Sequence, residues 1–198
     1  MTEAPPSLHP LLRERRSPRA FASRLVSDEE RLRLFEAARW APSCFNEQPW
    51  RFLTALRQHE AEFARLLSCL AEANQLWAKH AGLLIVTVAS QAFARNGKPN
   101  RFAAHDVGLA IGQLTVQASS MGLIVHQMGG FSPERVRELY AVPDDFEPVT
   151  AVAVGYPGVA SDLPENLRAR ELEPRVRRPL ASMLFQGGWD QPPPSTAD

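Results

Sequence analysis

Cysteine, tyrosine and lysine are scarce in this sequence, and no long hydrophobic run is present. The two cysteines, Cys44 and Cys69, are too few for a disulfide framework and fit a reducing compartment. No apolar stretch is long enough to span a bilayer, and the N-terminus lacks the hydrophobic centre of a signal peptide. The formal net charge is zero, so no overall field attracts nucleic acid or anionic lipid. We therefore expect a cytoplasmic protein without nucleic-acid or membrane partners.

Several familiar site signatures are also missing. No Gly-x-Gly-x-x-Gly follows a predicted strand, and Gly97-Lys98 lacks the upstream glycine of a phosphate-binding loop. The five histidines show no metal-ligand spacing, so His105 and His126 are interpreted as packing or surface groups. No serine lies in a nucleophile elbow and no carboxylate pair stands out. The sequence therefore argues against a Rossmann dehydrogenase and gives no catalytic side chain and no metal ligand.

The composition that is present is that of one globular domain. The chain has 198 residues, of which 44% are hydrophobic and 22% charged. We expect a single domain over residues 11–190, with flexible ends over residues 1–10 and 191–198, the second of which contains three consecutive prolines. All but two of the 22 basic residues are arginine, so a single arginine carries little information. The four between Arg13 and Arg19 stand above that background.

The hydrophobic pattern predicts an α+β fold with a central mixed or antiparallel sheet flanked by helices. Residues 82–89 are apolar on both faces, which predicts a central strand. The helix over 106–121 is rich in small residues, so we expect it at the centre of the fold or of a dimer. Residues 163–178 form a charged, proline-punctuated segment from which little burial is expected. Three other helices are predicted: one from the capping box of Ser27 and Glu30 to just before Pro42, one over residues 60–77, and one from Ser132 to Tyr140. The other predicted strands cover residues 50–56, 124–128 and 149–155.

A basic cluster, Arg15-Arg16-Ser17-Pro18-Arg19-Ala20-Phe21, lies near the N-terminus. It places three guanidinium groups and a hydroxyl within five residues, which suits a phosphate that accepts forked hydrogen bonds. The alternative is a solvated basic end of the chain, which composition alone favours.

A second polar cluster, residues 41–52, follows the first predicted helix. Its pattern is Pro42-Ser43-x-x-Asn46-x-Gln48-Pro49-Trp50, and its short polar groups suit the edges and hydroxyls of a heteroaromatic ligand. The alternative is an ordinary helix stop and loop, because serine and asparagine are common turn residues. Two later segments are also candidates. Residues 127–131 contain two glycines, and the alternative for them is a simple turn. Residues 175–180 form a basic run, and the alternative for it is a solvated face.

In order and spacing these clusters resemble the FMN-dependent nitroreductase family, and the resemblance covers Arg13 to Leu180. It implies an intertwined homodimer with two FMN sites at the interface, each built from both subunits. It also implies that the cofactor-binding residues are Arg15, Arg16, Ser17, Arg19, Pro42, Ser43, Asn46, Gln48, Gly129, Gly130, Arg175 and Arg177.

The resemblance further implies a role for each group of these residues. The cluster around Arg15 contacts the phosphate, ribityl chain and pyrimidine edge, with Arg16 contributing mainly backbone contacts. The 42–48 loop reaches FMN bound mainly by the other subunit. The amide of Gly129 faces the ring nitrogen that exchanges hydride, and the 175–177 arginines close over the phosphate. Asn74 and Lys79 are weaker candidates, and Cys44 is incidental.

The function implied is an FMN-dependent NAD(P)H oxidoreductase that uses NADH or NADPH as the donor. By ping-pong hydride transfer it would reduce a small-molecule acceptor such as a nitroaromatic, a quinone or an activated alkene. Two alternatives stay open at this point. One is an FMN-binding or storage protein without turnover, and the other is a flavin-degrading enzyme of the same fold.

Overall fold

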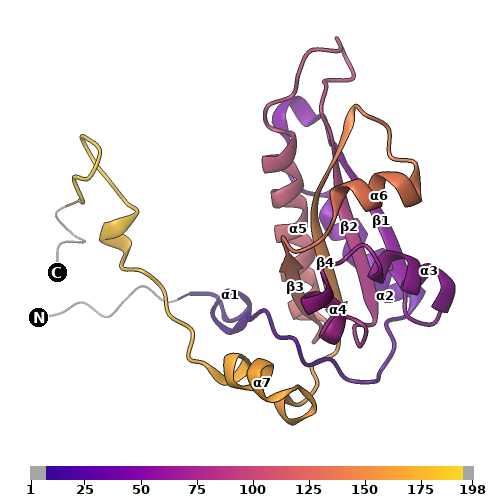
Figure 1. The fold of residues 1–198 in the computed structure, drawn as a ribbon. Helices are drawn as coiled ribbons and strands as arrows, with labels where there is room; N and C mark the ends of the chain where they lie inside the picture. Colours follow the sequence, from indigo (N-terminus) through magenta and orange to yellow (C-terminus); the bar gives the residue numbers. More distant parts are fainter. Residues whose placement is uncertain (1–7, 194–198) are drawn as a thin grey trace, which may run out of the picture.

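The computed structural model describes residues 8–193 (Figure 1). Its strands are β1 (Trp50–Leu56), β2 (Leu83–Ser90), β3 (Ile124–Met128) and β4 (Phe146–Gly155). Its helices are α1 (Pro10–Glu14), α2 (Asp28–Arg39), α3 (Glu60–Leu67), α4 (Glu72–Ala78), α5 (Ala103–Ser120), α6 (Pro133–Tyr140) and α7 (Glu165–Leu172). Short 3₁₀ turns cover Cys44–Asn46, Ala160–Asp162 and Leu180–Ser182. The predicted flexible ends lie partly at residues 1–7 and 194–198, outside the described residues.

The four strands form one antiparallel sheet in the order β1-β2-β4-β3, which confirms the α+β prediction. Leu83 of β2 pairs with Leu56 on one side and with Val154 on the other. The apolar run over residues 82–89 is therefore a central strand, as its pattern predicts.

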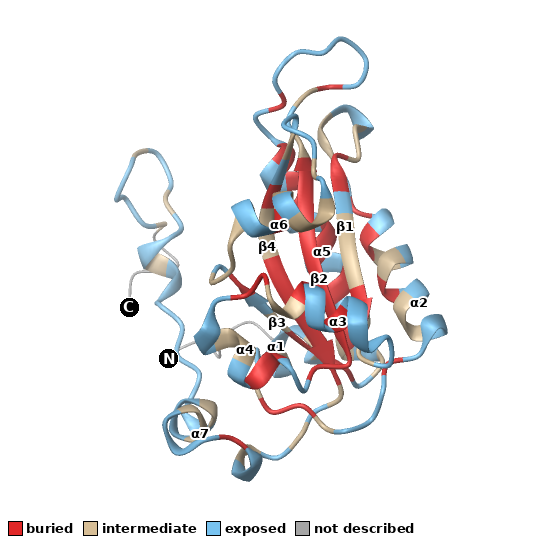
Figure 2. Cartoon of the chain, turned by 45° about the vertical axis from the view of Figure 1, so that its right-hand side comes forward, coloured by how far each residue is buried: buried red, intermediate tan, exposed pale blue. Residues whose placement is uncertain are grey.

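Helices cover both faces of this sheet, and its strands are buried between them (Figure 2). Because side chains alternate along a strand, Leu83 and Ile85 of β2 pack with α2 and α5, while Leu84 and Val86 pack with α3, α4 and α6. The small residues of α5 let it lie close against the sheet, with Ala110 fully buried. The helix over 106–121 is thus central to the fold and begins slightly earlier, at Ala103.

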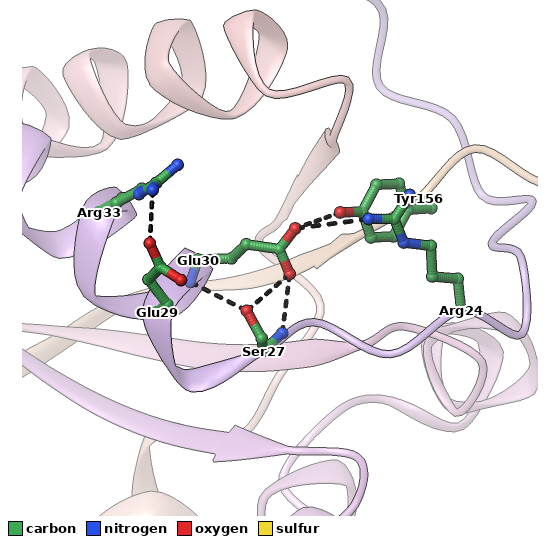
Figure 3. A network of polar contacts seen from close by, with 6 residues as sticks. All are labelled: Arg24, Ser27, Glu29, Glu30, Arg33 and Tyr156. Carbon is green, nitrogen blue, oxygen red and sulfur yellow. Dashed lines mark hydrogen bonds and ion pairs between the residues drawn. The ribbon is translucent and has the colours of Figure 1, made fainter.

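The predicted capping box of α2 is present and is extended by a neighbouring chain segment (Figure 3). The Ser27 hydroxyl accepts from the Glu30 amide at 3.2 Å, and the Glu30 carboxylate accepts from the Ser27 amide at 2.8 Å. Tyr156, directly after β4, donates its hydroxyl proton to the same carboxylate, and the guanidinium of Arg24 stacks 3.8 Å from the Tyr156 ring centre. The cap therefore also fixes the end of β4.

The prediction of one continuous helix over 60–77 is wrong. The chain breaks into α3 and α4, because the residues between them pair with the loop after β3. The Ala71 amide donates to the Gly130 carbonyl at 3.0 Å, and the Ser132 amide donates to the Cys69 carbonyl at 2.8 Å. An unbroken helix would use these groups internally and leave the loop without partners.

The remaining differences are at the two ends and in β4. The predicted lead-in, residues 1–10, ends in the start of α1: His9 caps the helix through its ring nitrogen, and Pro10 is the first helical residue. The last strand begins at Phe146, three residues before the predicted start. Leu163 is 8% exposed and packs into the core, so the prediction of little burial fails at this residue. After α7 the chain runs away from the body of the molecule (Figure 1).

Candidate functional site

The basic cluster is fixed in place by Phe21 at its end. Phe21 is 8% exposed, pairs with Pro157 as an antiparallel bridge, and stacks 6.2 Å from the Trp77 ring centre. The Gly158 amide donates to the Ala20 carbonyl at 2.9 Å. A Cβ at Gly158 would lie 2.7 Å from the Phe21 carbonyl carbon, so only glycine allows this approach. The core thus positions the chain just after the arginines.

A pocket of about 520 Å³ brings the N-terminal and C-terminal arginines together. Both groups were singled out from the sequence, although more than 150 residues separate them along the chain. The pocket is lined by Arg15, Arg16, Ser17, Pro18, Arg19, Ala20, Pro157, Gly158, Ala160, Arg170, Glu171, Glu173, Pro174, Arg175 and Arg177.

Two of these arginines brace the chain segments on which the pocket is built. Arg16 donates to the carbonyl oxygens of Glu171 and Glu173 at 3.0 and 2.9 Å. Arg175 donates in the opposite direction, to the carbonyl of Arg15 at 2.5 Å and to that of Arg13. These hydrogen bonds hold the segment after α7 against the segment after α1. The donors are charged guanidiniums and the acceptors are neutral carbonyls, so the bonds do not neutralise the positive charge of Arg16 and Arg175.

Electrostatics in the pocket fit an anionic ligand. Burial lowers the pKa of Arg15, and the like charges of Arg177 and Arg175 lower it further. The Arg15 guanidinium donates to the Ser17 hydroxyl at 2.9 Å, and no ion pair in the described part of the chain includes Arg15. A phosphate placed among these guanidiniums would relieve their mutual repulsion and accept forked hydrogen bonds. The residues present thus fit a phosphorylated cofactor.

A second cavity, of about 610 Å³, shares Arg15 and Ser17 with the first and extends along α5. Its floor includes Gly108 and Gly112, where an added Cβ would meet nothing within 4 Å. Its remaining lining is Leu12, Leu109, Gln113, Thr115, Val116 and Gln127. A ligand held by Arg15 at its anionic end can therefore extend a larger, flatter part over α5 and toward the end of β3.

The Gly129–Gly130 loop follows β3 beside this second cavity. The Gly130 carbonyl accepts from the Asn74 side chain at 2.9 Å, and a Cβ at Gly130 would lie 2.6 Å from that amide nitrogen. Gly129 is exposed, with open space where a Cβ would lie. Asn74, a weaker candidate, thus positions the loop, while Lys79 is exposed at the end of α4.

The 42–48 loop has an unusual backbone. Phe45, Asn46 and Gln48 have φ values of 55°, 56° and 51°, a left-handed region that residues other than glycine seldom occupy. The Ser43 hydroxyl accepts from the Gln48 amide at 3.0 Å, and the Gln48 side chain donates to the Asn46 side chain at 3.2 Å. Such strain persists only where surrounding contacts enforce it, and it is frequent at binding sites.

Asp106 was missed as a site residue by reasoning from the sequence. It is 2% exposed, and its carboxylate accepts from the Cys44 amide at 3.0 Å, so it anchors the 42–48 loop to the first turn of α5. The only signal was a carboxylate beside an apolar helix face. Within one chain the two clusters thus lie by different parts of α5: the loop is bonded to its first turn, and Arg15 and Ser17 line a cavity together with Gly108 and Gly112.

Of the two histidines interpreted as packing or surface groups, His126 packs against Trp77 and His105 has a side chain that is 66% exposed. His126 lies 4.6 Å from the Trp77 ring centre and bonds the Pro18 carbonyl, and its burial lowers its pKa. Within residues 8–193, no group of three His, Cys, Asp or Glu side chains could hold a metal ion. None of the described helices is long and apolar enough to cross a membrane.

Comparison with known proteins agrees with this geometry. An uncharacterized 15.4 kDa protein in the ask 5' region of Mycolicibacterium smegmatis is 37% identical over 130 residues, which cover 66% of this chain and 86% of that protein. An Archaeoglobus fulgidus protein called "Putative NADH dehydrogenase/NAD(P)H nitroreductase" is 28% identical over 155 residues, covering 76% of this chain and 86% of the other. A crystal structure described as an oxidoreductase containing FMN aligns with a TM-score of 0.88 and 36% identity over 96% of this chain and 95% of that one.

A family profile matches residues 12–156, which include both early clusters and the whole sheet. The match ends at Tyr156, where the chain leaves β4 for α7 and the C-terminal arginines. On this match, and on the fold and clusters it covers, the chain belongs to the nitroreductase family.

Proposed function

We propose that this protein is an FMN-dependent NAD(P)H oxidoreductase that reduces nitroaromatics, quinones or related electron-poor acceptors. The observation that carries the proposal is the joining of Arg15, Ser17, Arg175 and Arg177 around one pocket, where none of these three arginines forms an ion pair with a described residue. The FMN in the similar oxidoreductase supports the cofactor, and the name of the Archaeoglobus relative supports the donor, NADH or NADPH.

Each part of the site then has a task that follows from its chemistry. Arg15, Arg175 and Arg177 offset the phosphate charge, and Ser17 and Arg19 bind the ribityl chain and ring edge. Arg16 keeps the C-terminal segment in place through the carbonyls of residues 171 and 173. The loops contribute Pro42, Ser43, Asn46, Gln48, Gly129 and Gly130, with the Gly129 backbone amide directed at the flavin ring.

We further propose that the working unit is a homodimer with a shared site. On α5, Gly108, Leu109, Gly112 and Val116 face outward, and Leu109 and Val116 are 36% and 37% exposed. An apolar helix face with glycines allows a second backbone to approach closely. A partner packed there would bring its own 42–48 loop to the cavity beside Arg15, which the loop of the same chain does not line.

When bound, FMN supplies hydride acceptance from NAD(P)H and delivery of two electrons to the acceptor, in a ping-pong sequence. The side chains supply position and charge, and arginines near the ring would favour its reduced, anionic form. No general acid or base is assigned. The two described cysteines are free, with Cys69 buried, which fits a cytoplasmic location.

Two other functions are compatible with the same pocket: storage of FMN without turnover and oxygen-dependent breakdown of the flavin. Anaerobic reduction separates them from the proposal. The purified protein should be yellow, release FMN rather than FAD on heating, and lose its colour on addition of NADH or NADPH. Colour should return, with NAD(P)H consumed in proportion, when a nitroaromatic or quinone is added. A protein that takes up no FMN refutes the proposal. One that binds FMN but does not turn over is a storage protein if its chemically reduced flavin survives the admission of oxygen, and a flavin-degrading enzyme if that flavin is broken down.

A further inference from the structure

A second basic patch, separate from the phosphate pocket, lies on the segment between β2 and α5. This segment projects at the top of Figure 1. Residues 91–102 carry Arg95, Lys98 and Arg101 and no acidic residue, in a chain whose net charge is zero. None of the three forms an ion pair with another described residue.

The segment is ordered by its own hydrogen bonds. Ala92 and Pro99 form an antiparallel bridge, the Phe93 amide donates to the Lys98 carbonyl at 2.9 Å, and the Gly97 amide donates to the Phe93 carbonyl at 2.8 Å. Gly97 has a φ of 67°, which this tight turn requires. Arg95 therefore projects from the tip of a hairpin-like turn.

Arg95 stacks on Phe45, an exposed side chain of the 42–48 loop. Its guanidinium carbon lies 3.9 Å from the Phe45 ring centre and 5.4 Å from that of Phe93, and the two rings meet edge to face at 5.9 Å. The Ala94 amide donates to the Glu47 carboxylate at 2.6 Å, which joins the two loops directly. No ion pair joins Glu47 to Arg95.

Phe45 is a large apolar side chain that is largely exposed in this chain. Phe45 is 69% exposed and has a left-handed backbone, and it directly precedes Asn46. In this chain Phe45 presents an exposed aromatic ring with the unpaired Arg95 guanidinium over one face, an arrangement suited to binding a planar ring. The guanidinium additionally selects for a negative group beside that ring.

We propose that Arg95 and Phe45 form a specificity platform for ligands that carry an anionic group beside a planar aromatic ring. This rests on the proposed function, since it needs the 42–48 loop to border the flavin. Two ligands have the required chemistry: an aromatic acceptor with a carboxylate, and the 2'-phosphate beside the adenine of NADPH. The platform determines which donor or acceptor is preferred and has no part in holding FMN.

The test compares matched ligands that differ only in charge. For the holoenzyme, kcat/KM is measured for 4-nitrobenzoate and 4-nitrobenzamide with one donor, and for NADPH and NADH with one acceptor. We expect at least one anionic member to be favoured by about three- to tenfold, as exposed charge and cation–π contacts are individually weak. Arg95→Gln should abolish that preference, and the pair affected identifies the ligand. Calorimetry with benzoate and benzamide, or with NADP⁺ and NAD⁺, gives the same comparison without turnover.

Arg101→Gln is the matched control, because it removes the same charge from the same segment while Arg101 stacks only on Phe102, at 4.7 Å. It should keep the preference. Equal loss in both variants would mean general attraction of anions, and an unchanged preference in Arg95→Gln would exclude contact with Arg95; either result overturns the platform. Flavin content and dimer size are measured on each variant, and a dimer lost in Arg95→Gln would also overturn it. Absence of bound FMN in the unmodified protein would instead count against the proposed function.

Discussion

The carboxylate of Glu171 accepts hydrogen bonds from the backbone amide of Arg19 at 2.9 and 3.0 Å, across 152 positions of sequence. The neighbouring Ala20 amide donates to the same carboxylate at 3.2 Å. An acidic side chain from α7 thus accepts from two backbone donors inside a pocket whose lining includes six arginines. Glu171 thereby fixes α7, and with it Arg175 and Arg177, on the core.

Glu171→Ala should therefore loosen α7 and the residues after it. Loss of hydrogen bonds to a charged acceptor at a partly exposed site costs about 1 kcal/mol, or roughly fivefold in the local opening equilibrium. Trypsin should cut more quickly after Arg168 and Arg170 in this variant. Glu173→Ala is the control, since its carbonyl, rather than its side chain, contacts Arg16. Equal cleavage rates in both variants would mean that Glu171 does not hold α7.

Arg15→Ala should leave the fold intact and weaken the binding of FMN. A lost charge-assisted contact corresponds to about 1.5–3 kcal/mol, or roughly ten- to a hundredfold in Kd. Titration of the apoprotein with FMN measures this directly. Arg135→Ala is a suitable control, because Arg135 of α6 contacts Ser68 at the end of α3 and lines neither of the two cavities that contain Arg15 and Ser17. An unchanged Kd in Arg15→Ala would remove this residue from the site.

Mixing two inactive variants tests whether the site is shared between subunits. If Arg15 of one subunit meets Asn46 of the other, a heterodimer of Arg15→Ala and Asn46→Ala chains has one intact site and one doubly altered site. Flavin content and NAD(P)H oxidation should then exceed the average of the parents after the chains are unfolded and refolded together. If both residues served a site within one chain, each site would keep one lesion. Heterodimers confirmed by mass but without recovery would therefore contradict the shared site.

The Glu30 network should make stability depend on pH. Burial raises the pKa of Glu30, but hydrogen bonds from the Ser27 amide, Tyr156 and the Ser27 hydroxyl outweigh it and lower the pKa below 4.5. A carboxyl whose folded pKa is lowered stabilises the fold above its unfolded pKa, and this contribution is lost as pH falls through the folded value.

Glu30→Gln should therefore be less stable than the unmodified protein at pH 7, by about 1 kcal/mol from the weakened cap. The difference should shrink in urea unfolding measured near pH 3. Glu29→Gln is the control in the same turn, because Glu29 contacts only the exposed Arg33 (Figure 3). A difference that persists unchanged at low pH would exclude the charge of Glu30 as its cause.

The fold was predictable wherever local pattern and burial agree. The apolar run of β2 and the capping box of Ser27 specify their structures within a few residues. The break between α3 and α4 was not predictable, since Leu66, Leu67 and Leu70 continue the helical pattern through it. The break depends on a contact between Ala71 and Gly130, and no local pattern records a partner so far away.

The candidate site, too, was predictable in part. The sequence and its family resemblance predicted the basic cluster and the 42–48 loop as parts of the site, but gave no role to Glu171 or Asp106. An acid in the first or last turn of a helix is common on any surface, so only the folded chain shows that Asp106 anchors the loop. Arg95 was also indistinguishable from the other arginines until its stacking on Phe45 was known.

The close pairing of Phe21 with Pro157 and Gly158 also bears on how the protein is made. The N-terminal arginines are synthesised first, yet the segment that seats them follows β4, the last strand of the chain's sheet. A nascent chain still missing that segment would carry the basic cluster without its pocket. Contacts between distant parts of a sequence form late because closing the intervening loop costs entropy. The pocket around Arg15 is therefore completed only after β4 and the segment that follows it have been made, so cofactor binding would report a finished sheet.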